Sequence, residues 1–261
     1  MTEFVTSADG SRIAFNRDGG GPAVILIGGA MQFRAFDPTT VELARQLAAG
    51  GFTVINYDRR GRGETVAEPP FTLAREIEAL RTLIDMAGGS AGLFGNSSGG
   101  AIALAAAAAA APITKLAMFE VPLDDESGAE GAVFLEGIRE RIAAGDDERI
   151  IEFFMSDMPP EWLEGARRSE GWPMMVSIGP SLEVDAEALA WTQSAPRAQL
   201  WADITQQTLV MLGEETLDVM PPAAESIVAT LPNARIVTIP ASEHGWEPGV
   251  MAPRLAEFFG S

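Results

Sequence analysis

Apolar residues along the chain fall into short continuous runs that are separated by turn residues. The runs occupy 23–27, 53–57, 91–94, 115–119, 209–212 and 235–239. Continuous runs of this length are typical of strands that are buried on both faces of a sheet. Two further segments, 3–7 and 12–16, flank Asp9 and Gly10, a dipeptide that favours a hairpin turn. The pattern therefore predicts eight strands.

Segments with helical spacing of apolar residues lie between most of these runs. We expect helices over 38–49, 72–86, 222–231 and 251–259, and a further helix that begins at the Ser97 turn. Strands that alternate with helices form a mostly parallel sheet with helices on both faces. The expected fold class is therefore α/β, with a mostly parallel eight-stranded sheet flanked by helices.

The alternation of strands and helices stops between residues 122 and 202. This segment has no convincing strand pattern, carries many acidic side chains and holds most of the tryptophans. Open α/β sheets bind ligands beyond the carboxyl ends of their strands. We expect 122–202 to form a helical cap over that edge, inserted after the strand at 115–119, and 1–121 with 203–261 to form the core domain.

Composition narrows the classes of partner and of chemistry. The chain has 18 Lys and Arg against 37 Asp and Glu, a formal charge of −19, which disfavours nucleic acids and anionic membrane surfaces as partners. The basic cluster at 59–62 is interpreted as a solvated turn after a strand. The absence of cysteine excludes disulfides, thiolate metal sites and a cysteine nucleophile. Without a signal-peptide pattern or a membrane span, we expect a cytoplasmic protein; the oligomeric state stays open, a homodimer included.

One motif and one side chain suggest a chemistry. Residues 95–99 read Gly-Asn-Ser-Ser-Gly, a G-x-S-x-G between an expected strand and an alanine-rich expected helix. This context favours Ser97 as a nucleophile over a chance match to the motif. His244 is the only histidine and follows the last expected strand. A serine hydroxyl needs an adjacent base, so Ser97 and His244 together favour nucleophilic acyl transfer.

The chain resembles the α/β-hydrolase fold over essentially its whole length. The resemblance is carried by 25–30 (ILIGGA), 56–63 (NYDRRGRG), 95–100 (GNSSGG) and the late His244. One departure is Gly28, where many members have the histidine of a His-Gly pair. The resemblance implies a serine hydrolase that uses no cofactor and no metal. It also implies an oxyanion hole built from the backbone N–H groups of Ala30 and Ser98.

The acid that orients the histidine is the open member of the implied triad. Most members of the fold carry it after the strand that is here 209–212, although the usual position is occupied by Thr216. The candidates there are Glu214, Glu215 and Asp218. Glu120 ends the apolar run 115–119, where a carboxylate is costly unless it is paired. Because zearalenone-type lactonases and some bacterial relatives carry their acid at that point, we favour Glu120.

Large apolar side chains near these positions indicate an apolar pocket. The candidate substrate-binding residues are Met31, Trp172, Trp191 and Trp246, against the alternative that each packs within the fold. The expected substrate is a small apolar ester or lactone. Two other functions stay open: a lyase or biosynthetic tailoring enzyme that uses the same triad without hydrolysis, and a ligand-binding protein that retains the triad.

Overall fold

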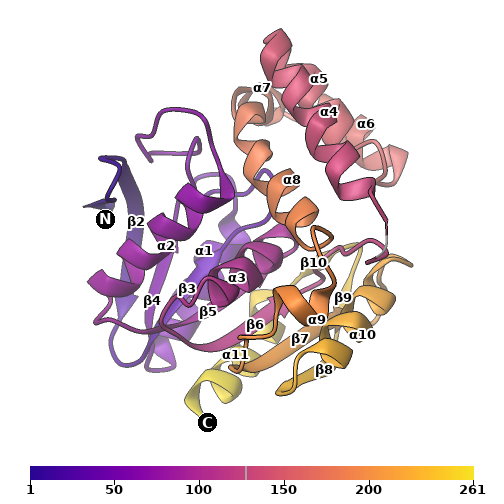
Figure 1. Cartoon of the computed structure of the whole chain (residues 1–261). Coiled ribbons are helices and arrows are strands. Elements are labelled where there is room, and N and C mark those ends of the chain that lie inside the picture. Colours follow the sequence, from indigo (N-terminus) through magenta and orange to yellow (C-terminus); the bar gives the residue numbers. More distant parts are fainter. Residues whose placement is uncertain (127) are drawn as a thin grey trace.

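The computed structural model describes residues 1–126 and 128–261 and contains one eight-stranded sheet. Its strands are β1 (Glu3–Thr6), β2 (Arg12–Gly19), β3 (Ala23–Ile27), β4 (Thr53–Tyr57), β5 (Ala91–Asn96), β6 (Ile113–Phe119), β7 (Gln207–Gly213) and β8 (Ala234–Ile239). They lie side by side in the order β1-β2-β4-β3-β5-β6-β7-β8 (Figure 1). β2 pairs antiparallel with both β1 and β4, and all the other pairs are parallel. The expected mostly parallel α/β fold is thereby confirmed.

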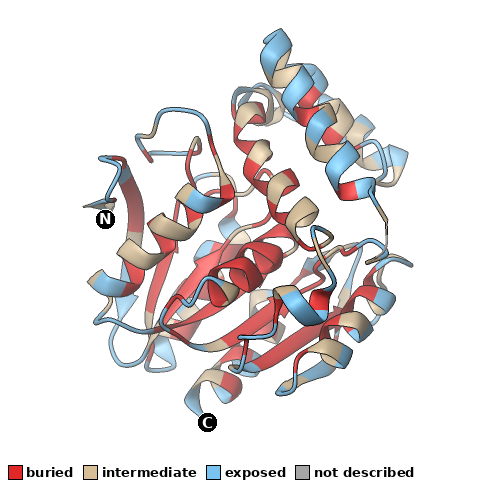
Figure 2. Cartoon of the chain, in the orientation of Figure 1, coloured by how far each residue is buried: buried red, intermediate tan, exposed pale blue. Residues whose placement is uncertain are grey.

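Helices cover both faces of this sheet, which leaves its central strands β3–β7 largely buried (Figure 2). One face packs against α1 (Pro38–Ala49) and α11 (Pro248–Gly260), and the other against α2 (Leu73–Met86), α3 (Ser98–Ala108) and α10 (Met220–Thr230). In β3, Val24 and Leu26 belong to the first layer, and Ile25 and Ile27 to the second. Because successive side chains of a strand point to opposite faces, such a strand is apolar at every position.

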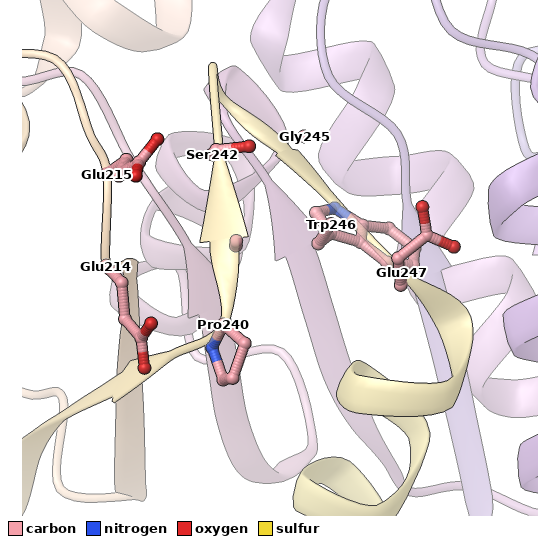
Figure 3. Close-up of a pocket in the computed structure, with 8 residues that line it drawn as sticks. Glu214, Glu215, Pro240, Ser242, Gly245, Trp246 and Glu247 are labelled. Carbon is pink, nitrogen blue, oxygen red and sulfur yellow. The ribbon is translucent and has the colours of Figure 1, made fainter.

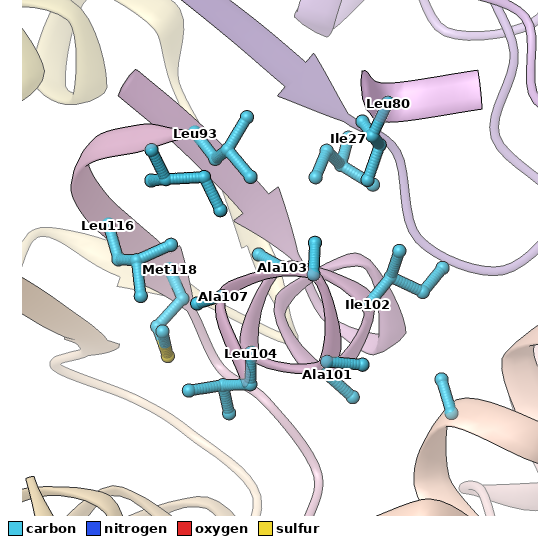
Figure 4. Close-up of a cluster of buried hydrophobic side chains, with 14 of the residues drawn as sticks. Ile27, Leu80, Leu93, Ala101, Ile102, Ala103, Leu104, Ala107, Leu116 and Met118 are labelled. Carbon is cyan, nitrogen blue, oxygen red and sulfur yellow. The ribbon is translucent and has the colours of Figure 1, made fainter. Parts of the chain in front are cut away.

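The central helix α3 is almost fully buried and lies close to the sheet. Figure 4 shows it surrounded by apolar side chains of α2, β3, β5 and β6. Its alanines and glycines permit this approach. A Cβ atom at Gly99 would lie 2.4 Å from the carbonyl oxygen of Ile27, and one at Gly95 would lie 2.5 Å from the carbonyl oxygen of Gly99. The glycines therefore fix how tightly the chain turns from β5 into α3.

We expect Gly99→Ala to lower the free energy of unfolding by about 2–3 kcal/mol, because the methyl group would meet the backbone of a central strand. The matched control is Gly249→Ala in α11, where an added Cβ meets no atom within 4 Å. The control should unfold at the same urea concentration as the wild type or slightly above it. Equal urea midpoints for both variants would contradict the close packing of α3.

Between β6 and β7 the chain forms helices and, among its described residues, no strand. These are α4 (Glu130–Ala144), α5 (Asp147–Phe154), α6 (Pro160–Arg168), α7 (Trp172–Ser177), the 3-10 turn Gly179–Ser181, α8 (Leu182–Trp191) and α9 (Arg197–Leu200). Figure 1 shows α4–α7 grouped at one end of the molecule, while α8 leads back and packs on α3. None of the described helices combines the length and apolar character needed to cross a bilayer.

The basic cluster after β4 is buried, so its interpretation as a solvated turn is wrong. Arg59, Arg60 and Arg62 are only 2%, 1% and 1% exposed. Arg59 and Arg62 pair with Asp185 of α8, and Arg60 pairs with Asp9. Buried guanidinium groups are tolerated where carboxylates pair with them. Asp185 lies 126 positions beyond Arg59, which is why the local sequence did not reveal the pairing.

Candidate active site

Two glycine-rich turns meet where the strand order reverses. β3 lies between β4 and β5 in the sheet. After β3 the chain passes to β4 on one side, and it returns later to form β5 on the other side. Open α/β sheets bind ligands beyond the carboxyl ends of the strands at such a point. The turn after β3 contains Gly29, where a Cβ atom would lie 3.0 Å from Cβ of Ser97, in the turn after β5. The two turns are therefore in contact.

Ser97 occupies the sharp turn between β5 and α3. Its backbone has φ 53° and ψ −127°, a combination that L-residues seldom adopt. Its amide donates to the carbonyl of Phe119 at 2.9 Å, which ties the turn to the end of β6. The Ser97 side chain is half-buried, and its hydroxyl makes no hydrogen bond within the described residues. The turn therefore presents a free hydroxyl at the carboxyl edge of the sheet.

Backbone strain marks this edge of the molecule. Among the described residues, six other than glycine have a positive φ. Five of them lie in the loops around the strand ends: Met31, Ser97, Glu120, Glu243 and His244. The sixth, Ala110, follows the end of α3. Strained conformations cost about 1–3 kcal/mol each and cluster at functional sites.

His244 is held by Glu120. The Nδ1 atom of His244 lies 2.6 Å from Oε2 of Glu120, and the side chains are 18% and 0% exposed. The other carboxylate oxygen of Glu120 accepts from the amide of Gly213 at 2.9 Å. Burial raises the pKa of Glu120, but the hydrogen bonds from His244 and the Gly213 amide, together with the nearby Thr216 hydroxyl, outweigh it, so the pKa lies below its ordinary value. Glu120 is therefore an ionised partner for the imidazole.

The imidazole lies at the turn of a small hairpin and faces two aromatic rings. The hairpin consists of β9 (Ala241–Ser242) and β10 (Gly245–Trp246). The ring of Phe119, the last residue of β6, lies 6.1 Å from the imidazole centroid at 30°. The ring of Trp162, in α6, lies 6.4 Å away at 21°. The polar Glu120–His244 pair therefore borders apolar surfaces of both the sheet and the α4–α9 segment.

The alternative acids lie elsewhere. Glu214, Glu215 and Asp218 are exposed. Glu214 and Glu215 line an open surface cavity of about 450 Å³, with Ser242 and Glu247 among its other walls (Figure 3). Figure 3 shows both glutamates on the same side of β9. The usual position of the acid is instead filled by Thr216, which has no carboxylate to offer. The geometry thus pairs His244 with Glu120 and with none of the later carboxylates.

Two backbone amides beside Ser97 are free of protein acceptors in the described part of the chain. One belongs to Ser98, the first residue of α3, where a helix leaves its N–H groups unpaired. The other belongs to Ala30 in the turn after β3. A helix N-terminus carries a partial positive charge and favours an anion. The structure therefore brings the two expected oxyanion donors to the same edge as Ser97.

A chain of side-chain hydrogen bonds connects the turns around Ser97. Oε1 of Gln32 accepts from the Gly29 amide at 2.6 Å and from Nδ2 of Asn96 at 3.0 Å. Oδ1 of Asn96 in turn accepts from Nε1 of Trp246 at 3.1 Å. The chain runs from the turn after β3, through the last residue of β5, to the hairpin that carries His244. It holds the three loops in register with one another.

The expected pocket residues fall into different clusters. Met31 and Trp172 pack in one apolar cluster with Ala30 and Trp162. Trp191 instead lines a separate cavity of about 500 Å³ that also borders α2 and α4. Trp246 is buried under β5, edge-to-face with Phe94. The structure therefore does not bring Trp191 or Trp246 to the cluster that contains Met31 and Trp172.

Of the tryptophans in the segment 122–202, Trp162 is the one whose ring faces the imidazole of His244. It is not among the substrate-binding residues expected from the sequence. Its helix carries apolar residues at helical spacing, which is also what ordinary packing requires. Only the contact with His244, which lies 82 positions later in the chain, distinguishes it. In the described residues, no group of three or more acidic or histidine side chains is arranged to hold a metal ion.

Comparisons with known proteins agree with this architecture. Residues 24–257 match the model of the alpha/beta hydrolase family. An alpha/beta hydrolase from Sphaerobacter thermophilus is 38% identical, with 98% of this chain and 100% of that chain covered and a TM-score of 0.85. A thermophilic esterase from Thermogutta terrifontis is 23% identical, with 100% and 97% covered and a TM-score of 0.71; this likeness concerns the fold alone. No curated protein sequence matches the chain significantly.

Proposed function

The chain belongs to the alpha/beta hydrolase family, and we propose that it is a serine hydrolase that cleaves a carboxylic ester or lactone of an apolar small molecule. One observation carries the proposal: the only histidine is paired at 2.6 Å with a buried carboxylate, at the same sheet edge as the strained Ser97 turn. Serine hydrolases combine a hydroxyl, an imidazole and a carboxylate in a triad, which geometry defines and sequence order does not. The Glu120–His244 pair supplies the last two members, and the proposal requires the Ser97 hydroxyl to approach Nε2 of His244 when substrate binds.

The mechanism follows from which nitrogen of His244 is already hydrogen-bonded. Because the Nδ1–H of His244 donates to Glu120, the Nε2 lone pair is left to take the proton of Ser97 as its oxygen attacks the substrate carbonyl. The oxyanion accepts hydrogen bonds from the amides of Ser98 and Ala30. His244 then protonates the leaving alkoxide, and water, activated by the same imidazole, releases the acid from the acyl-Ser97 ester.

The apolar surroundings support an apolar substrate. Ala30 and Met31 belong to one cluster with side chains of α4–α7, and Trp162 of that cluster reaches His244. We propose that 122–202 acts as a cap over a core of 1–121 and 203–261, and that this cluster provides the wall for the substrate's apolar part. The position of Glu120 after β6, shared with zearalenone-type lactonases, is the reason that lactones stand beside open-chain esters.

Trp162→Ala should lower kcat/KM for esters of long fatty acids by about tenfold, mainly through a higher KM, because it removes apolar surface beside the imidazole. The loss for an acetate ester should be smaller, because acetate has little apolar surface. Trp191→Ala is the matched control, since Trp191 lines the separate cavity and should leave both esters unaffected. Steady-state kinetics on p-nitrophenyl acetate and octanoate measure this; an equal loss for both esters would argue against a wall formed by Trp162.

The proposed activity is tested with a panel of p-nitrophenyl esters from acetate to decanoate and a set of aromatic lactones. We expect turnover of part of the panel by the wild type and none above background by Ser97→Ala. Tight binding of an apolar panel member without turnover would favour a ligand-binding protein instead. Cleavage of a cyanohydrin without ester turnover would favour the lyase alternative.

A further inference from the structure

A fully buried carboxylate reaches the turn of Ser97 from the α4–α9 segment. Asp185, in α8, is 0% exposed. Its Oδ1 accepts from the Ser98 hydroxyl at 2.6 Å and from Nη1 of Arg59 at 2.7 Å. Its Oδ2 accepts from Nη2 of Arg62. The mechanism above assigns no role to this carboxylate, although its partner Ser98 supplies one of the two oxyanion amides.

The same two guanidinium groups extend to the other turn. Nη1 of Arg59 donates to the carbonyl of Gly28 at 3.1 Å. Nη1 of Arg62 donates to the carbonyl of Gly29 at 2.7 Å and to that of Gln32 at 3.3 Å. These three carbonyls lie on both sides of Ala30, whose amide is the second expected donor. Asp185 is thus hydrogen-bonded to the side chain of Ser98, which supplies one expected oxyanion amide, and is linked through two arginines to the carbonyls around the other.

We propose that Asp185 is a positioning residue that holds the two halves of the oxyanion hole at a fixed separation. The inference rests on the proposed hydrolase function and names no new reacting group. Oxyanion donors are effective only when they are aimed at the transition-state oxygen in advance, and a small misplacement costs a large factor in rate. A carboxylate bound to groups on both turns limits how far either turn can move.

The charges of the cluster make this arrangement stable. Burial raises the pKa of Asp185, but the neighbouring Arg59 and Arg62 outweigh it and hold the pKa below its ordinary value. Burial and the nearby Arg59 lower the pKa of Arg62 to about 10, which leaves it protonated at neutral pH. Arg59 also lies 3.7 Å from the buried Glu76. Two buried cations therefore face two buried carboxylates, and each oxygen of Asp185 has a charged donor.

Two variants separate positioning from general stability. Asp185→Asn keeps the size of the side chain and removes its charge, and should lower kcat about 10²-fold with little change in KM. Ser98→Ala keeps the backbone amide and every Arg–Asp contact but removes one hydroxyl, and should lower kcat about tenfold. Ser98→Ala also keeps the test decisive if Asp185→Asn fails to fold, because it leaves no buried charge without a partner.

Asp9→Asn is the matched control. Asp9 pairs with Arg60, which is as deeply buried as Arg59 and Arg62, yet the contacts of Arg60 do not include the turns around Ala30 and Ser98. We expect this variant to lower the melting temperature while kcat stays within about twofold of the wild type. If the role of Asp185 were purely structural, each of the three variants would instead lose activity in proportion to its own loss of melting temperature.

The decisive readout is the inhibition constant of a trifluoromethyl ketone, which forms a tetrahedral adduct with the serine, measured beside kcat and KM. We expect the inhibitor to weaken in Asp185→Asn and Ser98→Ala by the same factor as kcat/KM, because both quantities report oxyanion binding. An active wild type whose kcat and inhibition constant are unchanged or improved in both variants would overturn the positioning role. A wild type that hydrolyses no ester and takes no inhibitor would instead refute the proposed function.

Discussion

Replacing Ser97 with glycine should abolish ester turnover and raise the stability of the fold in the same variant. The hydroxyl is the proposed nucleophile, so kcat should fall by at least about 10⁴-fold. The backbone at Ser97 has φ 53° and ψ −127°, a strained conformation for serine and an accessible one for glycine. Relief of about 1–3 kcal/mol of strain should exceed the entropic cost of glycine, for a net gain of about 1 kcal/mol.

Ser97→Ala is the matched control, because it removes the hydroxyl and keeps the strain. It should be as inactive as Ser97→Gly but no more stable than the wild type, as measured by urea unfolding followed by circular dichroism. A glycine variant that is less stable than the alanine variant would contradict the strained turn. Measurable turnover by either variant would contradict the assigned nucleophile.

Glu120→Gln should lower kcat by about 10³–10⁴-fold while the protein stays folded. An amide at this position can still accept from Gly213, but its NH₂ group would face Nδ1 of His244 and favour the tautomer with the proton on Nε2. That tautomer cannot take the proton of Ser97. KM should change little, since Glu120 is 0% exposed and does not line the proposed pocket.

The controls for Glu120 are the three carboxylates that the sequence left as alternatives. Glu214→Gln, Glu215→Gln and Asp218→Asn remove charges that are exposed in the structure. Each should keep kcat within about threefold of the wild type. A loss of activity in one of them that exceeded the loss in Glu120→Gln would assign the acid to the loop after β7.

The strands and two members of the proposed triad, Ser97 and His244, could be predicted because their signals in the sequence are local. A strand between two helical layers must be apolar throughout, so β3 and β4 begin and end at the expected residues. Ser97 lies in a motif whose glycines permit the turn, and His244 is the only histidine. The sequence could reduce the choice of acid only to a few candidates, because Glu120 and His244 are 124 positions apart and meet only when the fold brings the end of β6 to the turn of the β9–β10 hairpin.

The contacts that the sequence analysis missed are those made across the sheet edge. The arginines at 59–62 look solvated in a strongly acidic chain, and only the fold brings Asp185 to Arg59 and Arg62. Trp162 has the spacing of a packing residue and becomes distinctive only beside His244. In each case one of the two contacting residues comes from the segment 122–202, whose helices have no motif that fixes their place on the core.

The most direct test of the account is to treat the protein with a fluorophosphonate and locate the adduct by peptide mass spectrometry. A fluorophosphonate forms a covalent bond only with a serine whose hydroxyl is activated by a neighbouring base. The account predicts a single adduct on Ser97, which is lost in Ser97→Ala and forms far more slowly in Glu120→Gln. A native protein that forms no adduct, or forms it on another serine, would contradict a Ser97–His244–Glu120 triad.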